Sequence, residues 1–195
     1  MLKMVIALLS TALAVGGVAM IGSSLVQIQK TVEYSGKDYL PAMQEQWAEM
    51  PTSPTVIKAA INTGSYIGQL AISSLKMKVN IFEGTENAAL SKGAGHYRKS
   101  VMPGETDNSV IAGHRDTYFS TLGKIKVGAL IRITTREGVF QYRVVRTRIV
   151  DKNDRTVIVP TDSATVTLST CYPFRYIGSA PQRFIVSGVL EVKIV

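Results

Sequence analysis

The last two thirds of the chain consist of short β-rich runs separated by turn residues, and this succession limits the possible folds more than any other feature. In the final run, Leu190, Val192 and Ile194 alternate with Glu191 and Lys193, which is the two-residue period of a half-buried strand. Strands are predicted at 67–72, 76–82, 108–113, 129–134, 139–150, 156–159, 165–171 and 183–194. Brief helices are predicted only around 86–91 and 117–123. So many strands with so little helix predict an all-β domain that forms a closed or nearly closed β-barrel.

An apolar segment precedes this domain. No residue from Met4 to Gln29 is charged, and a helix needs about 20 apolar residues to cross a bilayer. We therefore expect residues 1–29 to form an uncleaved transmembrane anchor. The three-residue flank before it favours an N-terminus in the cytoplasm and a domain outside the membrane. A cleaved signal peptide is the alternative, because the stretch 12–14 (ALA) imitates a cleavage site, although the apolar run continues after it.

The segment between the anchor and the β-rich part is polar. It contains a candidate short helix at 38–49, followed by the helix-breaking stretch 50–54 (MPTSP). The expected organisation is an anchor at 1–29, a stalk at 30–65 and a β-barrel domain at 66–195.

The formal net charge is +8, and much of it comes from arginines and lysines between 132 and 155. The sequence shows no helix-turn-helix pattern, metal-finger spacing or aromatic-interleaved basic patch, so we expect no nucleic-acid partner. For a domain outside a membrane, anionic lipid or acidic wall polymers are nearer partners. A non-catalytic, membrane-anchored barrel that binds acidic cell-wall polymers is therefore one functional hypothesis, and a simply solvated basic face is another.

The chain has a single cysteine, which lies at the end of a predicted strand. Within 165–171, Val166 and Leu168 share the apolar face, and Cys171 shares the other face with Thr165 and Thr167. A structural free cysteine is usually buried among apolar groups. This placement instead predicts an accessible, reactive thiol.

A nucleophilic thiol needs a group that handles protons and a group that stabilises an oxyanion. The chain offers two histidines. His114 follows the end of a predicted strand, whereas His96 lies in a Gly-rich segment, so His114 is the better-placed candidate. Arg183 opens the last predicted strand, and hairpin geometry brings it close to Cys171.

At these positions the chain resembles the sortases, membrane-anchored cysteine transpeptidases of Gram-positive bacteria. The motif TLSTC (167–171), the histidine upstream and the arginine downstream carry the resemblance. The strings IFEGT (81–85), LSKGAGHY (90–97), VIAGHRDTYF (110–119) and TCYPFRYIGSAPQRFIV (170–186) are most similar to class D sortases. The resemblance covers about residues 66–195 and implies an eight-stranded sortase-type barrel.

The resemblance also implies roles for individual residues. Cys171 matches the nucleophile, His114 the general acid/base, and Arg183 the group that binds the substrate backbone and the oxyanion. Thr170 matches a position that helps to stabilise the intermediate. His96 and Asp116 fall within matching strings and are expected to shape the pocket.

The implied reaction is cleavage of an LPxTG-like C-terminal sorting signal after its threonine, through a thioacyl-enzyme, and transfer of the protein to an amine. The implied partners are surface proteins that carry the motif and a cell-wall precursor of the lipid II type. The implied location is the cell membrane, with the domain on its outer side. No cofactor and no metal are expected.

The loop 151–164 joins two predicted strands that flank the expected groove. Its apolar residues Val157, Ile158, Val159 and Pro160 are hypothesised to pack against the Leu-Pro part of a sorting motif.

Three other functional interpretations of the sequence are disfavoured. In papain-like proteases the cysteine precedes the histidine, whereas here His114 comes first. L,D-transpeptidases combine the two residues in one compact motif that is absent from this sequence. A zinc site built from His96, His114 and Cys171 lacks the short ligand spacing that such sites usually show.

Overall fold

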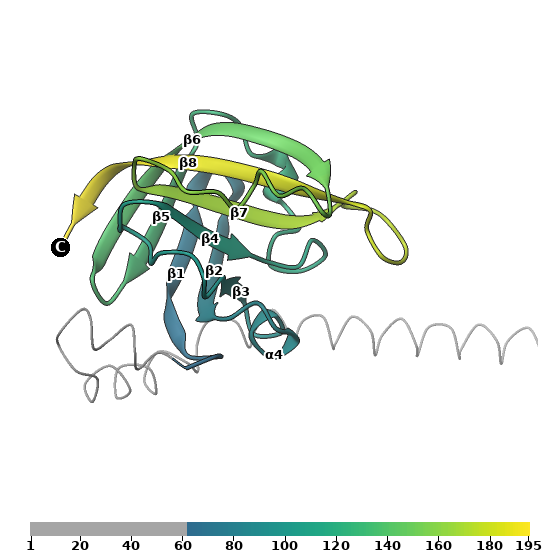
Figure 1. Ribbon diagram of the computed structural model, residues 1–195, viewed down its shortest axis with the longest axis horizontal. Coiled ribbons are helices and arrows are strands. Elements are labelled where there is room, and N and C mark those ends of the chain that lie inside the picture. Colours follow the sequence, from purple (N-terminus) through teal and green to yellow (C-terminus); the bar gives the residue numbers. More distant parts are fainter. Residues whose placement is uncertain (1–61) are drawn as a thin grey trace, which may run out of the picture. The chain divides into compact units, whose positions relative to one another are not determined.

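The computed structural model describes residues 62–195, which form an all-β closed barrel of eight strands (Figure 1). The strands are β1 (Tyr66–Ile72), β2 (Met77–Glu83), β3 (Ala94–His96), β4 (Asn108–Ala112), β5 (Leu130–Thr135), β6 (Gly138–Asp151), β7 (Thr165–Tyr172) and β8 (Gln182–Ile194). The predicted all-β class and the eight-stranded barrel are thus confirmed. The predicted anchor and nearly all of the predicted stalk lie outside the described residues. Within 62–195, no helix has the length and apolar character needed to cross a membrane.

Around the barrel the strands follow the order β1-β2-β3-β4-β7-β8-β6-β5, and pairing of β5 with β1 closes the ring. Two neighbouring pairs, β2–β3 and β4–β7, are parallel, and the other pairs are antiparallel. β7 therefore lies between parallel β4 and antiparallel β8, as Figure 1 shows. Because β4 and β7 run in the same direction, the residues that follow both strands lie at the same end of the barrel.

The barrel interior is filled mainly by aliphatic side chains on the inward faces of the strands. Leu70, Ile81 and Ile133 are completely buried. Tyr142 is also fully buried, and its hydroxyl accepts a 2.7 Å hydrogen bond from the Gly104 backbone N–H. Burial disfavours the charged phenolate and raises the pKa of Tyr142 to about 12, and the Gly104 bond opposes this shift.

One predicted strand is wrong and one real strand was not predicted. Residues 156–159 lie in the loop between β6 and β7 rather than in a strand. There the Asn108 side-chain amide donates to the carbonyls of Val157 and Val159 at 3.3 and 3.2 Å, in place of strand partners. The eighth strand is β3, a three-residue segment whose glycine content predicted a loop. It forms because pairing with β2 and β4 satisfies its backbone groups.

The helical segments are shorter than predicted. The helix expected at 86–91 is the single turn α4 (Asn87–Leu90), and the segment expected at 117–123 consists of turns followed by the 3₁₀ helix η2 (Leu122–Lys124). A further 3₁₀ turn, η1 (Ser73–Leu75), joins β1 to β2. All three are connectors on a β-barrel.

Candidate active site

The cysteine and the arginine are placed by the pairing of β7 with β8. Cys171 is the direct cross-strand partner of Arg183 in the antiparallel register. Side chains directly opposite each other in such a pair have Cβ atoms about 5 Å apart and point to the same face. Cys171 is partly exposed and is a free thiol. The sequence-based prediction that the two residues are neighbours is therefore correct.

The histidine is placed by the parallel pairing of β4 with β7. Ala112 is the partner of Ser169, and the Gly113 N–H extends the ladder with a 3.1 Å bond to the Ser169 carbonyl. Two residues beyond that pair lie His114 on one chain segment and Cys171 on the other. The register of the barrel thus brings the histidine and the cysteine to the same end of adjacent strands.

Two local contacts fix the strand end that carries His114. The Thr170 hydroxyl, which is buried, donates a 2.7 Å hydrogen bond to the Gly113 carbonyl. A Cβ at position 113 would lie 2.8 Å from the ring of Phe119, which is too close for an ordinary contact. Glycine is therefore the residue that fits at this position without a shift of Phe119. The residue before the nucleophile is therefore bonded to the residue before the histidine.

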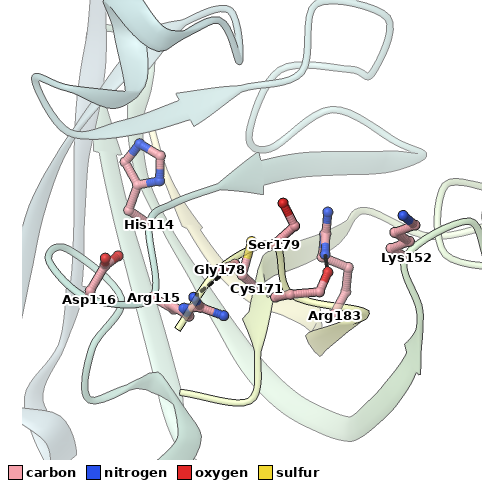
Figure 2. A pocket seen from close by; sticks show the side chains of 9 residues that line it. His114, Arg115, Asp116, Lys152, Cys171, Gly178, Ser179 and Arg183 are labelled. Carbon is pink, nitrogen blue, oxygen red and sulfur yellow. Dashed lines mark hydrogen bonds between the residues drawn. The ribbon is translucent and has the colours of Figure 1, made fainter. Parts of the chain in front are cut away.

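The side chains meet at one cavity of about 430 Å³. Figure 2 shows Cys171 between His114 and Arg183 in that view. The full lining consists of His114, Arg115, Asp116, Lys152, Cys171, Gly178, Ser179, Ala180 and Arg183. Among these described residues, no hydrogen bond joins His114, Cys171 and Arg183 to one another. The open arrangement leaves room for a ligand group between them.

The Arg183 side chain is anchored through one of its nitrogens. Nη1 donates to the carbonyls of Ala180 at 3.1 Å and Gln182 at 2.9 Å. Among the described residues, the Nε and Nη2 donors have no such partner. The anchored guanidinium can therefore present its remaining fork of donors to an oxygen in the cavity.

Of the other residues selected from the sequence, only Asp116 lines the cavity. Thr170 is buried behind the nucleophile, and its bond to Gly113 ties β7 to β4. The segment 157–160 does not contribute to the lining, although Ile158 and Val159 are 51% and 43% exposed. Its proposed contact with substrate stays a prediction.

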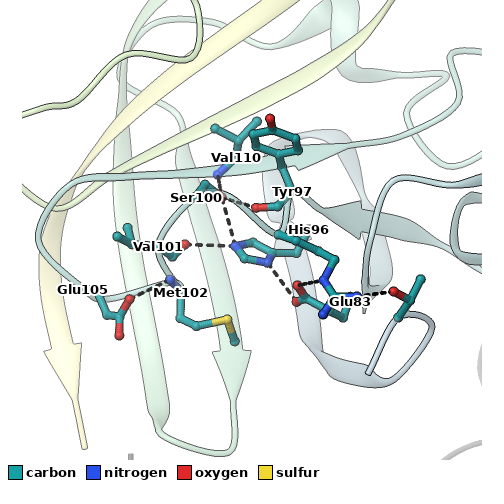
Figure 3. A network of polar contacts seen from close by, with 10 residues as sticks. Glu83, His96, Tyr97, Ser100, Val101, Met102, Glu105 and Val110 are labelled. Carbon is teal, nitrogen blue, oxygen red and sulfur yellow. Dashed lines mark hydrogen bonds and ion pairs between the residues drawn. The ribbon is translucent and has the colours of Figure 1, made fainter. Parts of the chain in front are cut away.

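His96 lies on β3 and is only 2% exposed. Its Nδ1 lies 2.9 Å from a Glu83 carboxylate oxygen, and its Nε2 lies 2.9 Å from the Val101 carbonyl oxygen, both within hydrogen-bond distance (Figure 3). Nε2 also lies 3.1 Å from the Ser100 hydroxyl, which accepts a bond from the Val110 N–H on β4. Both ring nitrogens of His96 therefore have polar partners inside the protein. His96 therefore belongs to a buried polar network and is not among the residues that line the cavity.

The structure also gives no support to a zinc site built from His96, His114 and Cys171. Both ring nitrogens of His96 are already occupied by contacts with Glu83 and Val101. Within residues 62–195, no group of three or more His, Cys, Asp or Glu side chains is arranged to hold a metal ion.

The predicted accessibility of the polar face of β7 holds only at its C-terminal end. Thr165 and Thr167 are buried, 8% and 2% exposed, whereas Ser169 and Cys171 are partly exposed. Burial is tolerated because a threonine hydroxyl can bond to nearby backbone, as Thr165 does to the Ser163 carbonyl at 3.0 Å. Residue polarity therefore did not reveal how much of this face is covered.

Three polar lining side chains were not selected from the sequence: Arg115, Lys152 and Ser179. Arg115 has the clearest sequence signal, because it lies between His114 and Asp116 in the string VIAGHRDTYF. Lys152 directly follows β6, and Ser179 lies in the loop between β7 and β8. Their approach to the cavity depends on how the loops fold over the end of the barrel.

A family model described as a sortase domain matches residues 70–191. Sortase D of Bacillus subtilis is 41% identical over 127 residues, which cover 65% of this chain and 64% of that protein. Sortase A of Listeria monocytogenes is 32% identical over 149 residues, covering 73% of this chain and 65% of that protein. The chain thus spans just under two thirds of the length of these curated relatives.

Solved structures show the same likeness. A Clostridium perfringens sortase D5 transpeptidase is 29% identical, with a TM-score of 0.64 over 76% of this chain and 95% of that chain. The crystal structure of the Listeria monocytogenes sortase A is 30% identical, with a TM-score of 0.60 over 67% of this chain and 92% of that chain. The barrel therefore has counterparts in proteins of known fold.

Proposed function

This chain belongs to the sortase family, and we propose that it is a cysteine transpeptidase of the class D type. The single observation that carries the proposal is the shared cavity of Cys171, His114 and Arg183, with Cys171 and Arg183 directly paired across β7 and β8. The proposed substrate is a protein with an LPxTG-like C-terminal sorting signal. The proposed acceptor is an amine of a cell-wall precursor.

In the first half-reaction, the Cys171 thiolate attacks the carbonyl carbon of the threonine in the sorting signal. A C–S bond forms, and the carbonyl oxygen becomes an oxyanion that accepts hydrogen bonds from the free donors of Arg183. The C–N bond then breaks as the His114 imidazolium gives its proton to the leaving amine. A thioester joins the substrate to Cys171, and His114 is left neutral.

In the second half-reaction, the acceptor amine attacks the thioester carbonyl. His114 takes the proton that the amine loses, the C–S bond breaks, and the thiolate is restored with a new amide as product. The charge pattern suits both halves, because a nearby imidazolium and guanidinium each favour a thiolate.

The cellular setting is part of the proposal. An anchor at residues 1–29 would hold the catalytic domain at the outer face of a Gram-positive cell membrane, where sorting signals and wall precursors meet. The apolar segment 4–29 and the sortase family together support this setting.

The proposal is tested with a fluorogenic LPxTG-like peptide and an amine acceptor. The wild-type chain is expected to cleave the peptide and to form a thioacyl-enzyme whose mass identifies the residue before the cut. Cys171→Ala is expected to show no turnover while its far-UV circular dichroism stays unchanged. Appreciable turnover by that variant would contradict the nucleophile assignment.

The competing hypothesis, a non-catalytic barrel that binds acidic wall polymers, is separated by alkylation. Iodoacetamide is expected to modify Cys171 readily in the folded protein and to abolish transpeptidation, as for an activated thiolate. A folded protein whose thiol resists alkylation, and which retains wall polymer without turnover, would favour the binding module.

A further inference from the structure

We propose that Arg115 is a positioning residue that fastens the loop between β7 and β8, residues 173–181, to the strand end that carries His114. The loop forms one wall of the catalytic cavity, so the position of Arg115 sets the shape of the substrate site. The predicted effect on catalysis rests on the proposed transpeptidase function, whereas the predicted effect on the loop does not.

Three hydrogen bonds from one guanidinium define the contact. Arg115 Nη1 donates to the Pro173 carbonyl at 3.1 Å, and Nη2 donates to the carbonyls of Tyr176 at 2.8 Å and Gly178 at 3.2 Å. The guanidinium carbon also lies 5.8 Å from the centre of the Tyr176 ring. A single side chain therefore contacts the beginning and the middle of the loop.

The loop has few other attachments in its middle. Its first part is held by Phe174, whose ring packs edge-to-face against Phe184 at 5.5 Å. Its last part is held by the Lys152 N–H, which donates to the Pro181 carbonyl at 3.0 Å, and by Arg183. Between these ends, Ile177 is fully exposed and packs no apolar surface. The Arg115 bonds are thus the main interactions that hold residues 175–178.

The same loop residues form part of the cavity. Gly178, Ser179 and Ala180 line it together with Arg115 itself (Figure 2). Because Arg115 directly follows His114 in the chain, one short segment carries both the histidine and the clamp for the opposite wall. Release of the clamp would therefore widen the site next to the histidine.

Arginine is suited to this role by its geometry. Its planar fork carries donors on two terminal nitrogens and can serve several carbonyls at once, whereas a lysine ammonium is a single point donor on a flexible stem. Arg115→Lys keeps the charge but loses the fork. It therefore separates an electrostatic contribution from the bonds to the loop.

The loop is tested first by limited proteolysis of the full chain. Chymotrypsin is chosen because it cleaves after Tyr176 and does not recognise the substituted position. Arg115→Ala is expected to be cut there at least about tenfold faster than wild type, since losing three hydrogen bonds of ordinary net strength shifts the opening equilibrium by that factor or more. Arg115→Lys is expected to fall between the two.

Arg132→Ala is the matched control, because Arg132 is an exposed arginine on β5 that does not line the cavity. It is expected to be cut at the wild-type rate. Equal rates of cleavage after Tyr176 in wild type, Arg115→Ala and Arg132→Ala would overturn the clamp.

Catalysis supplies a second readout that a purely structural role would not move. In Arg115→Ala, the KM for the sorting peptide is expected to rise about tenfold with a smaller change in kcat, because a misplaced cavity wall mainly weakens substrate binding. Arg115→Lys is expected to recover part of the loss. An unchanged KM in Arg115→Ala would overturn the link to the substrate site.

The two proposals fail in different ways. Absence of turnover in the wild-type chain with every sorting peptide would refute the transpeptidase function, and the proteolysis result would still decide the clamp. Normal turnover in wild type, together with equal rates of cleavage after Tyr176 in wild type and Arg115→Ala, would refute the clamp alone.

Discussion

Cys171 and Arg183 are direct partners across β7 and β8, and the Arg183 guanidinium is tied to two carbonyls close to it in the chain. The distance between the two side chains is thus set by the sheet rather than by a flexible loop. A site built on paired strands holds its geometry better than one built on loops.

Arg183→Ala is expected to lower kcat/KM for the sorting peptide by about 10² to 10³, the usual cost of removing an oxyanion donor. Arg183→Lys is expected to recover only a small part, because lysine keeps the charge without the fork. The measurement is steady-state kinetics with the fluorogenic peptide. A lysine variant with wild-type rates would show that charge alone is required.

His114→Ala is expected to lower the rate by about 10² to 10⁴, the typical contribution of a general acid/base. His96→Ala is expected to be milder for the rate, because His96 does not line the cavity. His96→Ala is instead expected to lower the stability of the domain, since the buried Glu83 carboxylate would lose its closest partner. We expect a loss of about 3 kcal/mol in urea unfolding, as for other broken buried pairs. The reverse ranking of rates would exchange the roles of the two histidines.

Thr170→Val is expected to destabilise the domain by about 1 to 3 kcal/mol, because it leaves the buried Gly113 carbonyl without its donor. It is also expected to lower kcat, since Gly113 precedes His114. Thr170→Ser is the control, because serine keeps the hydroxyl. Urea unfolding and peptide kinetics are measured on both variants, and equal values for valine and serine would argue against the bond.

Alkaline conditions are expected to destabilise the folded domain through Tyr142. Its pKa is raised by burial from 10.0 to about 12, so the neutral phenol contributes stability that is fully present below pH 10. This contribution is lost as the pH rises from 10 through about 12, and it amounts to roughly 2 to 3 kcal/mol. Urea unfolding of wild type and Tyr142→Phe at pH 8 to 11 measures the part of this loss that occurs below pH 11.

Tyr142→Phe is expected to be less stable at pH 8, because the Gly104 N–H loses its acceptor, but to lose less stability with rising pH. Tyr66, whose pKa is also raised by burial, contributes equally to both proteins. Identical pH slopes for wild type and variant would refute the assignment to Tyr142.

The double substitution Ile158→Ser, Val159→Ser tests the β6–β7 loop. Both side chains are substantially exposed, so we expect stability to change by less than about 0.5 kcal/mol. Selectivity for Leu-Pro over Ala-Ala in the sorting peptide is expected to fall, because apolar contact area is lost. Unchanged selectivity would remove the support for this loop as a substrate contact.

The fold could be predicted from the sequence wherever alternation was strong. The long runs that became β6, β7 and β8 lie within one residue of their predicted ends. The failures were short segments. The run 156–159 has strand-forming residues but finds no strand partner, and β3 contains a glycine yet is held by neighbours on both sides. Local propensity cannot report such long-range pairing.

The candidate site was predictable from the sequence only where it depends on the pairing of consecutive strands. Hairpin pairing placed Arg183 close to Cys171 from the sequence alone, because the two strands are consecutive, and the structure shows them to be direct cross-strand partners. The clamp by Arg115 was not predictable, since its acceptors are backbone carbonyls 58 to 63 residues further along the chain. Backbone carbonyls leave no signature in a sequence.

Closure of the barrel has a consequence for inhibitors. Many peptide-binding domains recruit an extended ligand as an additional strand on an open sheet edge. Here the strand that carries the thiol has hydrogen-bonded neighbours on both sides, so it offers no backbone row to a bound peptide. Compounds that imitate an added strand should therefore fail against this protein. A warhead for the sulfur, combined with groups that reach the guanidinium and the loop walls, is the better starting point for chemistry.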